Sequence, residues 1–131
     1  MAEHPNVEAV RAGLEAFMKG DMETMSSNMA DDVVWHIPGK HEWAGDYRGK
    51  AEVVGRFQRM AQAGVTSSID EIHDIVGNDE HVVALVKLTI TRAGKSVTTN
   101  SVQVYHVKDG KAIEFWATND RLDEIEALLK S

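Results

Sequence analysis

Four consecutive segments in the second half of the chain carry apolar residues at a period of two, and this feature limits the possible folds most strongly. The segments are residues 65–76, 81–92, 95–108 and 111–118. Because successive side chains of a strand point to opposite faces, this period predicts β-strands. The turn sequences between them are Gly77-Asn78-Asp79-Glu80, Ala93-Gly94 and Asp109-Gly110, the last being the strongest hairpin signal. Together they predict a four-stranded antiparallel meander.

Helical spacing dominates the residues before this meander. The first predicted helix has Asn6 as its cap and Gly20 just past its end, and its apolar face consists of Val7, Val10, Leu14, Phe17 and Met18. Asp21 is expected to cap a second, short helix, and a third helix is predicted between Gly49 and Gly64.

A short strand and a closing helix complete the predicted elements. Residues 33–37 are mostly β-branched or aromatic and end at Pro38-Gly39, which predicts a buried strand followed by a polar loop over residues 39–48. Asp120 is expected to cap a last helix that buries Leu122, Ile125, Leu128 and Leu129. Helices followed by a meander, without alternating βαβ units, predict the α+β class.

Composition narrows the function classes. The 131 residues are expected to form one domain, residues 1–131. No cysteine is present, which excludes a disulfide framework, a thiol nucleophile and a thiolate metal site. The net charge of −7 makes nucleic acid an unexpected partner. The absence of a long apolar stretch or leader predicts a cytoplasmic protein without membrane contact. Six histidines without an i, i+4 pair and the lack of nucleotide motifs predict neither a metal nor a cofactor.

The turns also predict cross-strand neighbours, because the turn of a hairpin fixes the register of its two strands. We expect Arg92 opposite Lys95, Lys108 opposite Lys111, and His81 opposite Val76. One face is then built in three rows: Ile72, Leu85, Val102 and Ala117; Val83, Val104 and Phe115; and Asp70, Lys87, Asn100 and Asn119.

The polar row on this face has two interpretations. It can lie where the face meets solvent, since Lys and Asp are mostly exposed, or it can form the polar end of an apolar cavity. The opposite face is too apolar to contact water, so it is expected to form a homodimer interface through Val86, Leu88 and Trp116. A one-residue slip would exchange the faces and make the set from Val82 to Ile90 the core.

Several short motifs in this order resemble the SnoaL-like group of polyketide cyclase-like proteins, within the nuclear transport factor 2-like fold. They are Gly20-Asp21, Ala30-Asp31-Asp32-Val33-Val34-Trp35, Gly45-Asp46-Tyr47-Arg48-Gly49-Lys50 and Val104-Tyr105-His106-Val107-Lys108-Asp109-Gly110-Lys111. The resemblance implies a conical half-barrel, with helices packed on a curved, mostly antiparallel sheet. It also implies a pocket on the concave face and a convex face often used to dimerise, which favours the three-row face as the pocket wall.

Two chemistries known among such proteins lack their residues here. The positions that match the proton-transfer groups of ketosteroid isomerases hold Ile37, Gly13 and Val102. The positions that match the Arg and two Asp of limonene epoxide hydrolases hold Lys87, Thr89 and Ala117. Neither mechanism is therefore expected.

A SnoaL-type cyclase would need another acid or base in the pocket. The sequence offers Asp70, His36, His106 and Asp120, although Asp120 is the expected helix cap and His36 alternates with the inward-pointing Trp35 and Ile37. The catalytic candidates are Asp70 and Lys87, because a desolvated Lys87 could act as a base or hold an anion.

The expected ligand is a small hydrophobic molecule with one polar or anionic end. Trp43 and Tyr47 either cover the pocket as a lid or anchor their loop. Two functions remain open: a small-molecule-binding protein or enzyme, and a non-catalytic dimeric interaction module with a closed pocket. The residues predicted to line the pocket are Trp35, Ile37, Trp43, Tyr47, Phe57, Leu85, Lys87, Asn100, Val102, Phe115, Ala117 and Asn119.

Overall fold

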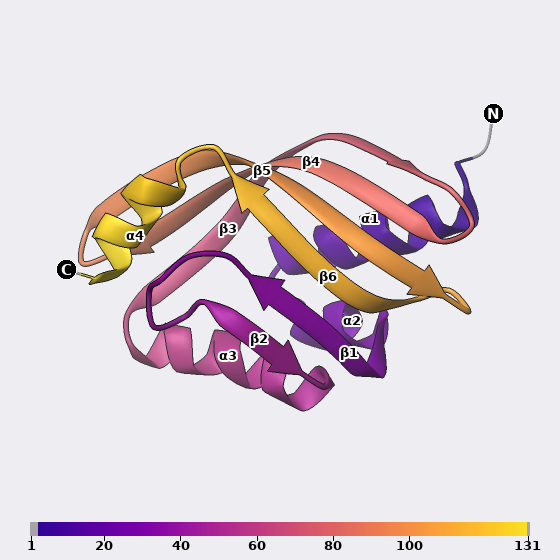
Figure 1. Cartoon of the computed structure of the whole chain (residues 1–131), viewed down its shortest axis with the longest axis horizontal. Helices are drawn as coiled ribbons and strands as arrows, with labels where there is room; N and C mark the ends of the chain where they lie inside the picture. Colours follow the sequence, from indigo (N-terminus) through magenta and orange to yellow (C-terminus); the bar gives the residue numbers. More distant parts are fainter. Residues whose placement is uncertain (1–2, 131) are drawn as a thin grey trace.

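The computed structural model describes residues 3–130, in which four helices pack on one six-stranded sheet (Figure 1). The elements are α1 Pro5–Met18, α2 Met22–Ser27, β1 Met29–Ile37, β2 Gly45–Arg48, α3 Lys50–Gln62, β3 Val65–Gly77, β4 His81–Arg92, β5 Lys95–Lys108, β6 Lys111–Asn119 and α4 Leu122–Lys130. The predicted α+β class is confirmed. The polar loop predicted over residues 39–48 is wrong in its last part, which forms the edge strand β2. None of the helices within residues 3–130 is long and apolar enough to cross a bilayer.

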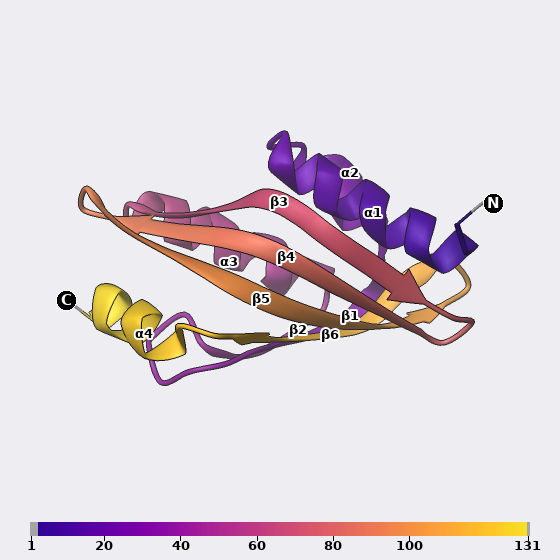
Figure 2. The same ribbon diagram turned by 90° about the horizontal axis from the view of Figure 1, so that it is seen from above.

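The strands follow the order β2-β1-β6-β5-β4-β3 across the sheet. Neighbouring strands are antiparallel, except that β1 and β6 are parallel. The sheet curves and does not close (Figure 2). The start of α1 lies near one end of the long strands and α4 near the other (Figures 1 and 2).

One face of the sheet, called the inner face here, carries the core. Val82, Ala84 and Val86 of β4 are at most 2% exposed and pack with apolar residues of α1, while Ile90 packs with residues of α3 and α4. The inner face therefore contains Val86 and Leu88 of the predicted dimer interface, whereas Trp116, its third residue, lies on the outer face. This prediction of the faces is wrong for β4, and the one-residue slip considered as its alternative describes the observed core.

The β4–β5 hairpin has the predicted register along its whole length. Arg92 lies opposite Lys95, and Lys87 lies opposite Asn100. Ala93 and Gly94 both adopt positive φ angles, of 54° and 78°, as the two-residue turn of a twisted hairpin requires. The pairing was therefore right, but the faces assigned to the strands were not.

A bulge in β6 separates residues of β5 and β6 that were predicted to share a face. Lys108 lies opposite Lys111 as predicted, but β6 then advances from Ala112 to Glu114 while β5 moves back by only one residue. Ile113 is the extra residue, and a single extra residue exchanges the faces beyond it. Phe115 therefore lies opposite Tyr105 rather than Val104, and Asn119 lies opposite Ser101 rather than Asn100.

β3 contains two further irregularities. Between its pairs with β4 the register shifts after Ile69 and again after Ile72, which leaves Asp70 and His73 as extra residues. The predicted pair of Asp70 with Lys87 is therefore wrong, because Glu71 lies opposite Lys87.

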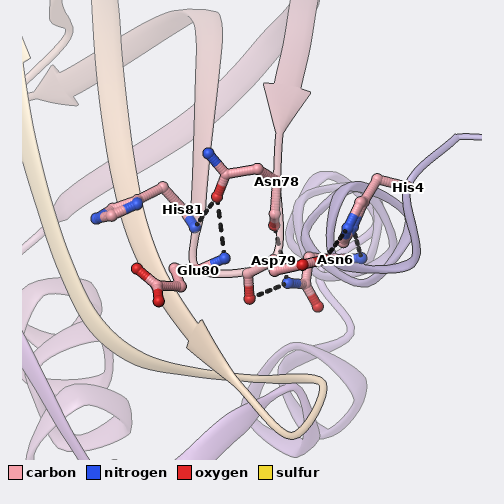
Figure 3. A network of polar contacts seen from close by, with 6 residues as sticks. All are labelled: His4, Asn6, Asn78, Asp79, Glu80 and His81. Carbon is pink, nitrogen blue, oxygen red and sulfur yellow. Dashed lines mark hydrogen bonds and ion pairs between the residues drawn. The ribbon is translucent and has the colours of Figure 1, made fainter.

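The start of α1 is fastened to the turn between β3 and β4 (Figure 3). His4, not the predicted Asn6, caps the helix, because its Nδ1 accepts the Asn6 main-chain N–H at 3.1 Å. The His4 Nε2 lies 2.8 Å from the Asp79 carboxylate. The Asn6 side chain donates to the main-chain oxygens of Asn78 and Asp79, both at 3.0 Å. These contacts hold α1 across the inner face, where it forms part of a cavity wall.

Candidate functional site

A cavity of about 150 Å³ lies between the inner face and the helices. Its wall is mostly apolar and rich in aromatic rings, and its larger side chains include Leu14, Phe17, Trp35, Phe57, Met60 and Phe115. The rings contact one another: Trp35 and Phe115 have centroids 4.4 Å apart, and Trp35 meets Phe57 edge-on at 5.7 Å. An apolar cavity of this size has room for an aromatic ring.

Polar side chains of β5 and β6 form one part of the wall. Ser101 lies opposite Asn119, and neither the Ser101 Oγ nor the Asn119 Oδ1 has a hydrogen-bond partner although both atoms are buried. Gln103 is the next inner residue of β5, and its Oε1 accepts a hydrogen bond from the Tyr105 hydroxyl at 2.8 Å. Burial raises the pKa of Tyr105, so its hydroxyl stays protonated and remains a donor.

Arg56 and His41 form another part of the wall. Arg56 is 7% exposed, and its Nε donates to the main-chain oxygen of Trp43 at 3.1 Å. Its guanidinium lies over the rings of Tyr47 and Phe57, 5.3 and 5.4 Å from their centroids. The His41 Nδ1 accepts the Trp43 N–H at 3.1 Å, which places the remaining ring proton on Nε2.

Burial governs the ionisation of these two side chains. It lowers the pKa of His41, and the positive charge of Arg56 lowers that pKa further. His41 is therefore neutral at pH 7. Burial also lowers the pKa of Arg56, but a guanidinium ionises so far above pH 7 that it keeps its charge.

Half of the residues predicted to line the pocket lie in the cavity wall. These are Trp35, Ile37, Phe57, Phe115, Ala117 and Asn119. Trp43 and Tyr47 are absent from the wall and lie behind it, in core clusters with helix residues. The Tyr47 hydroxyl donates to the Trp43 main-chain oxygen at 2.8 Å, so these contacts match loop anchoring rather than a lid.

The other four predicted residues lie on the outer face, defined here as the face opposite Val82, Ala84 and Val86. They are Leu85, Lys87, Asn100 and Val102, and none of them borders the cavity. Lys87 is exposed and its Nζ lies 3.7 Å from the Glu71 carboxylate, so it is neither desolvated nor near the cavity. The strand alternation that buries Val86 necessarily turns Lys87 outward.

The acid–base candidates are also outside the cavity wall. Asp70 is exposed in the β3 bulge and accepts hydrogen bonds from the hydroxyls of Ser68 and Thr89. Asp120 does not cap α4 through its side chain. Instead its carboxylate accepts from the Thr99 hydroxyl at 2.8 Å and the Asn100 main-chain N–H at 2.9 Å, and these bonds lower its pKa.

His36 and His106 belong to a charged row on the outer face. The two ring nitrogens of His36 lie 2.7 Å from carboxylate oxygens of Asp46 and Glu114, and His106 lies 3.1 Å from the other oxygen of Glu114. His81 follows in the same row, with its ring 4.6 Å from that of His106. Within residues 3–130, no group of three or more His, Asp or Glu side chains is arranged to hold a metal ion.

Sequence reasoning missed Arg56, His41, Ser101 and Gln103. A signal for Arg56 was present, because it lies three residues after Val53 and four before Met60, within the apolar stripe of α3. Ser101 and Gln103 alternate with Val102 and Val104, which were predicted to be the inward residues of β5, so the wrong choice of face hid them.

Comparison with known proteins places the chain in a class. The SnoaL-like domain family matches residues 10–115. Among curated relatives, the uncharacterized protein Rv0034 of Mycobacterium tuberculosis is 31% identical over 121 residues, which cover 89% of this chain and 92% of the relative. The chain therefore belongs to the SnoaL-like domain family.

Solved structures place this family within the nuclear transport factor 2-like fold. TerC, co-crystallized with polyporic acid, superposes with a TM-score of 0.85 at 25% identity, over 98% of this chain and 100% of that chain. A nuclear transport factor 2-like protein of unknown function from Burkholderia pseudomallei gives a TM-score of 0.81 at 25% identity, over 98% and 99% of the two chains.

Proposed function

We propose that this protein binds a small, largely hydrophobic molecule with one polar or anionic end in the cavity beneath the helices. The observation that carries the proposal is an apolar, aromatic cavity whose wall includes buried and unpaired polar atoms, among them two oxygens, the Ser101 Oγ and the Asn119 Oδ1. Each such atom costs about 1–3 kcal/mol while it has no partner. A ligand with a hydroxyl or amide group would supply partners to both.

The cavity wall also limits the chemistry. Among the described residues it contains no Asp, Glu or Lys, and His41 is its one imidazole. Isomerisation of a ketosteroid or opening of limonene epoxide needs positioned carboxyl groups, and proton transfer contributes about 10²–10⁴-fold to such rates. We propose that the protein carries out neither reaction. The co-crystal structure of TerC with polyporic acid supports a small-molecule ligand for this fold.

A substitution that fills the cavity with a larger side chain tests the proposal. Benzamide and 1-naphthamide should bind the parent protein, and Ala117→Leu should weaken binding by at least about tenfold, because three added carbons occupy the ligand's space. Thr118→Leu is the matched control, since Thr118 is the next residue of β6, is exposed and lies on the outer face. Calorimetric titration measures both. The absence of binding to the parent, or equal binding by the two variants, would contradict the proposal.

The outer face supports the second candidate, a homodimeric module. Val102 is 38% exposed there, and Leu85, Val104 and Trp116 are only partly buried. We propose that a second copy of the chain covers these residues, in place of the interface through Val86 and Leu88 expected from the sequence. Leu85→Asp should convert a dimer to a monomer in sedimentation at micromolar concentration. A monomeric parent would overturn this interface. The expected cytoplasmic location stays a prediction.

A further inference from the structure

Arg56 is a buried positive charge without a negative partner. Among the described residues, no carboxylate lies within ion-pair distance of it, in contrast to Lys87 and Lys50, which pair with Glu71 and Asp31. Burying an ionised group is costly unless it is paired and hydrogen-bonded. The fold therefore holds a charge inside the molecule that its own side chains do not neutralise.

The surroundings of Arg56 leave most of its donors available. A guanidinium has five N–H donors. One donates to the Trp43 main-chain oxygen, and a second is engaged by the Tyr47 hydroxyl, which leaves three. The Tyr47 and Phe57 rings contact the guanidinium and fix it in place. Because Arg56 lines the cavity, the free donors are within reach of a molecule bound there.

The other residues of the cavity wall determine which group is favoured in the part of a ligand that does not contact Arg56. Aromatic rings of Phe17, Trp35, Phe57 and Phe115 border the same cavity. Such rings favour a flat aromatic partner, through edge-to-face and offset contacts. His41, the neighbour of Arg56 in the wall, is neutral, so Arg56 supplies the only full charge among the described wall residues.

We propose that Arg56 is the anion-binding group of the cavity and that the ligand is a small aromatic acid bound as its carboxylate. This inference rests on the proposed function. A planar guanidinium can bind both oxygens of a carboxylate with two parallel hydrogen bonds, which a neutral amide of the same shape cannot match. The aromatic part of the ligand lies against the rings, and its carboxylate replaces the missing counter-ion of Arg56.

Paired probes of equal shape test the inference. Benzoate and benzamide, and 1-naphthoate and 1-naphthamide, differ in charge but hardly in size. The parent should bind each acid at least about tenfold more tightly than its amide at pH 7, because the hydrogen bonds are charge-assisted and shielded from water. Arg56→Met should remove this preference while binding of the amides stays within about threefold of the parent. Calorimetric titration gives each ratio.

Two matched variants control for charge and helix composition. Arg59→Met changes an exposed Arg of the same helix, and Lys87→Met changes the cation of the outer face; both should keep the preference for acids. If Arg56→Met does not fold, the ratio of the affinities for acid and amide is compared between the parent and Arg56→Lys instead.

The outcomes separate the inference from the proposed function. Binding of amides without a preference for acids overturns the role of Arg56 and leaves the cavity a binding site. A preference that survives in Arg56→Met, or disappears in Lys87→Met, places the anion elsewhere and overturns the inference. A parent that binds neither acids nor amides contradicts the proposed function itself.

Discussion

The charged groups on the two sides of the sheet differ in their partners and in their exposure to solvent. On the outer face, Asp46, His36, Glu114 and His106 form a row in which each imidazole contacts a carboxylate, and each side chain is partly open to solvent. In the cavity between the inner face and the helices, the wall has one cation, Arg56 of α3, and no carboxylate among the described residues. Water screens the outer row, whereas the inner charge lies in a medium of low dielectric constant.

This difference indicates which face can recognise a ligand. A satisfied and solvated network gains little from a new partner, because surface ion pairs contribute about 0–1 kcal/mol. The Arg56 guanidinium, which has no carboxylate partner, and the unpaired oxygens of Ser101 and Asn119 in the same cavity wall would gain much more, because each group already bears the cost of lost hydration. The charged residues that are most conspicuous in the sequence lie on the outer face, and the charge that we propose to bind the ligand lies among apolar neighbours.

The two faces should differ most in how far an introduced carboxylate lowers the free energy of unfolding. Val82→Asp places a carboxylate at a position that is fully buried among α1 and sheet residues, and should lower the free energy of unfolding by more than about 4 kcal/mol. Thr118→Asp, on the outer face, should change it by less than about 1 kcal/mol. Urea unfolding at pH 7 measures both. A similar loss of unfolding free energy in the two variants would contradict the placement of Val82 on a buried face and Thr118 on an exposed one.

A smaller effect concerns pH and the outer row. Both ring nitrogens of His36 contact carboxylates, and only the protonated ring can donate from both. The hydrogen bonds to Asp46, and then to Glu114, raise the pKa of His36 above its usual 6.5. Its contribution is therefore complete below pH 6.5 and is lost as the pH rises through the higher pKa of the folded state.

Glu114 limits the same contribution on the acidic side. Its hydrogen bonds to His36, and then to His106, lower its pKa below 4.5, so its contribution is present above pH 4.5 and is lost on further acidification. The row should therefore contribute most to the free energy of unfolding between pH 4.5 and pH 6.5. His36→Gln should flatten the decline in unfolding free energy above pH 6.5, by less than about 1 kcal/mol because the row is exposed.

Local patterns in the sequence predicted most of the fold. The bounds of β4 and β5 and their pairing followed from alternation and from the Ala93-Gly94 turn. The extra residue Ile113 could not be foreseen, because an apolar β-branched residue fits a regular strand as well as a bulge. That one residue moved Phe115, Ala117 and Asn119 to the face of Tyr105, so residues from different strands were predicted to be neighbours but lie on opposite sides.

The site was harder to predict than the fold for a related reason. Asp70, Lys87 and Asp120 attract attention as ionisable groups, yet the structure places them at a bulge, an exposed strand position and a strand–helix junction. Arg56 stands within the apolar stripe of α3, where a charged residue contradicts the pattern around it. Such a local contradiction is a better guide to a buried site than charge alone.

The three tryptophans allow the most direct test of the inner face as the binding face. Trp35 lines the cavity, Trp43 is buried behind it, and Trp116 lies on the outer face beside His106. Each indole N–H gives one signal in a proton–nitrogen correlation spectrum. Titration with 1-naphthamide should shift the Trp35 signal most and leave the Trp116 signal in place. Shifts confined to Trp116, or no shift of Trp35 at saturation, would contradict binding in the cavity.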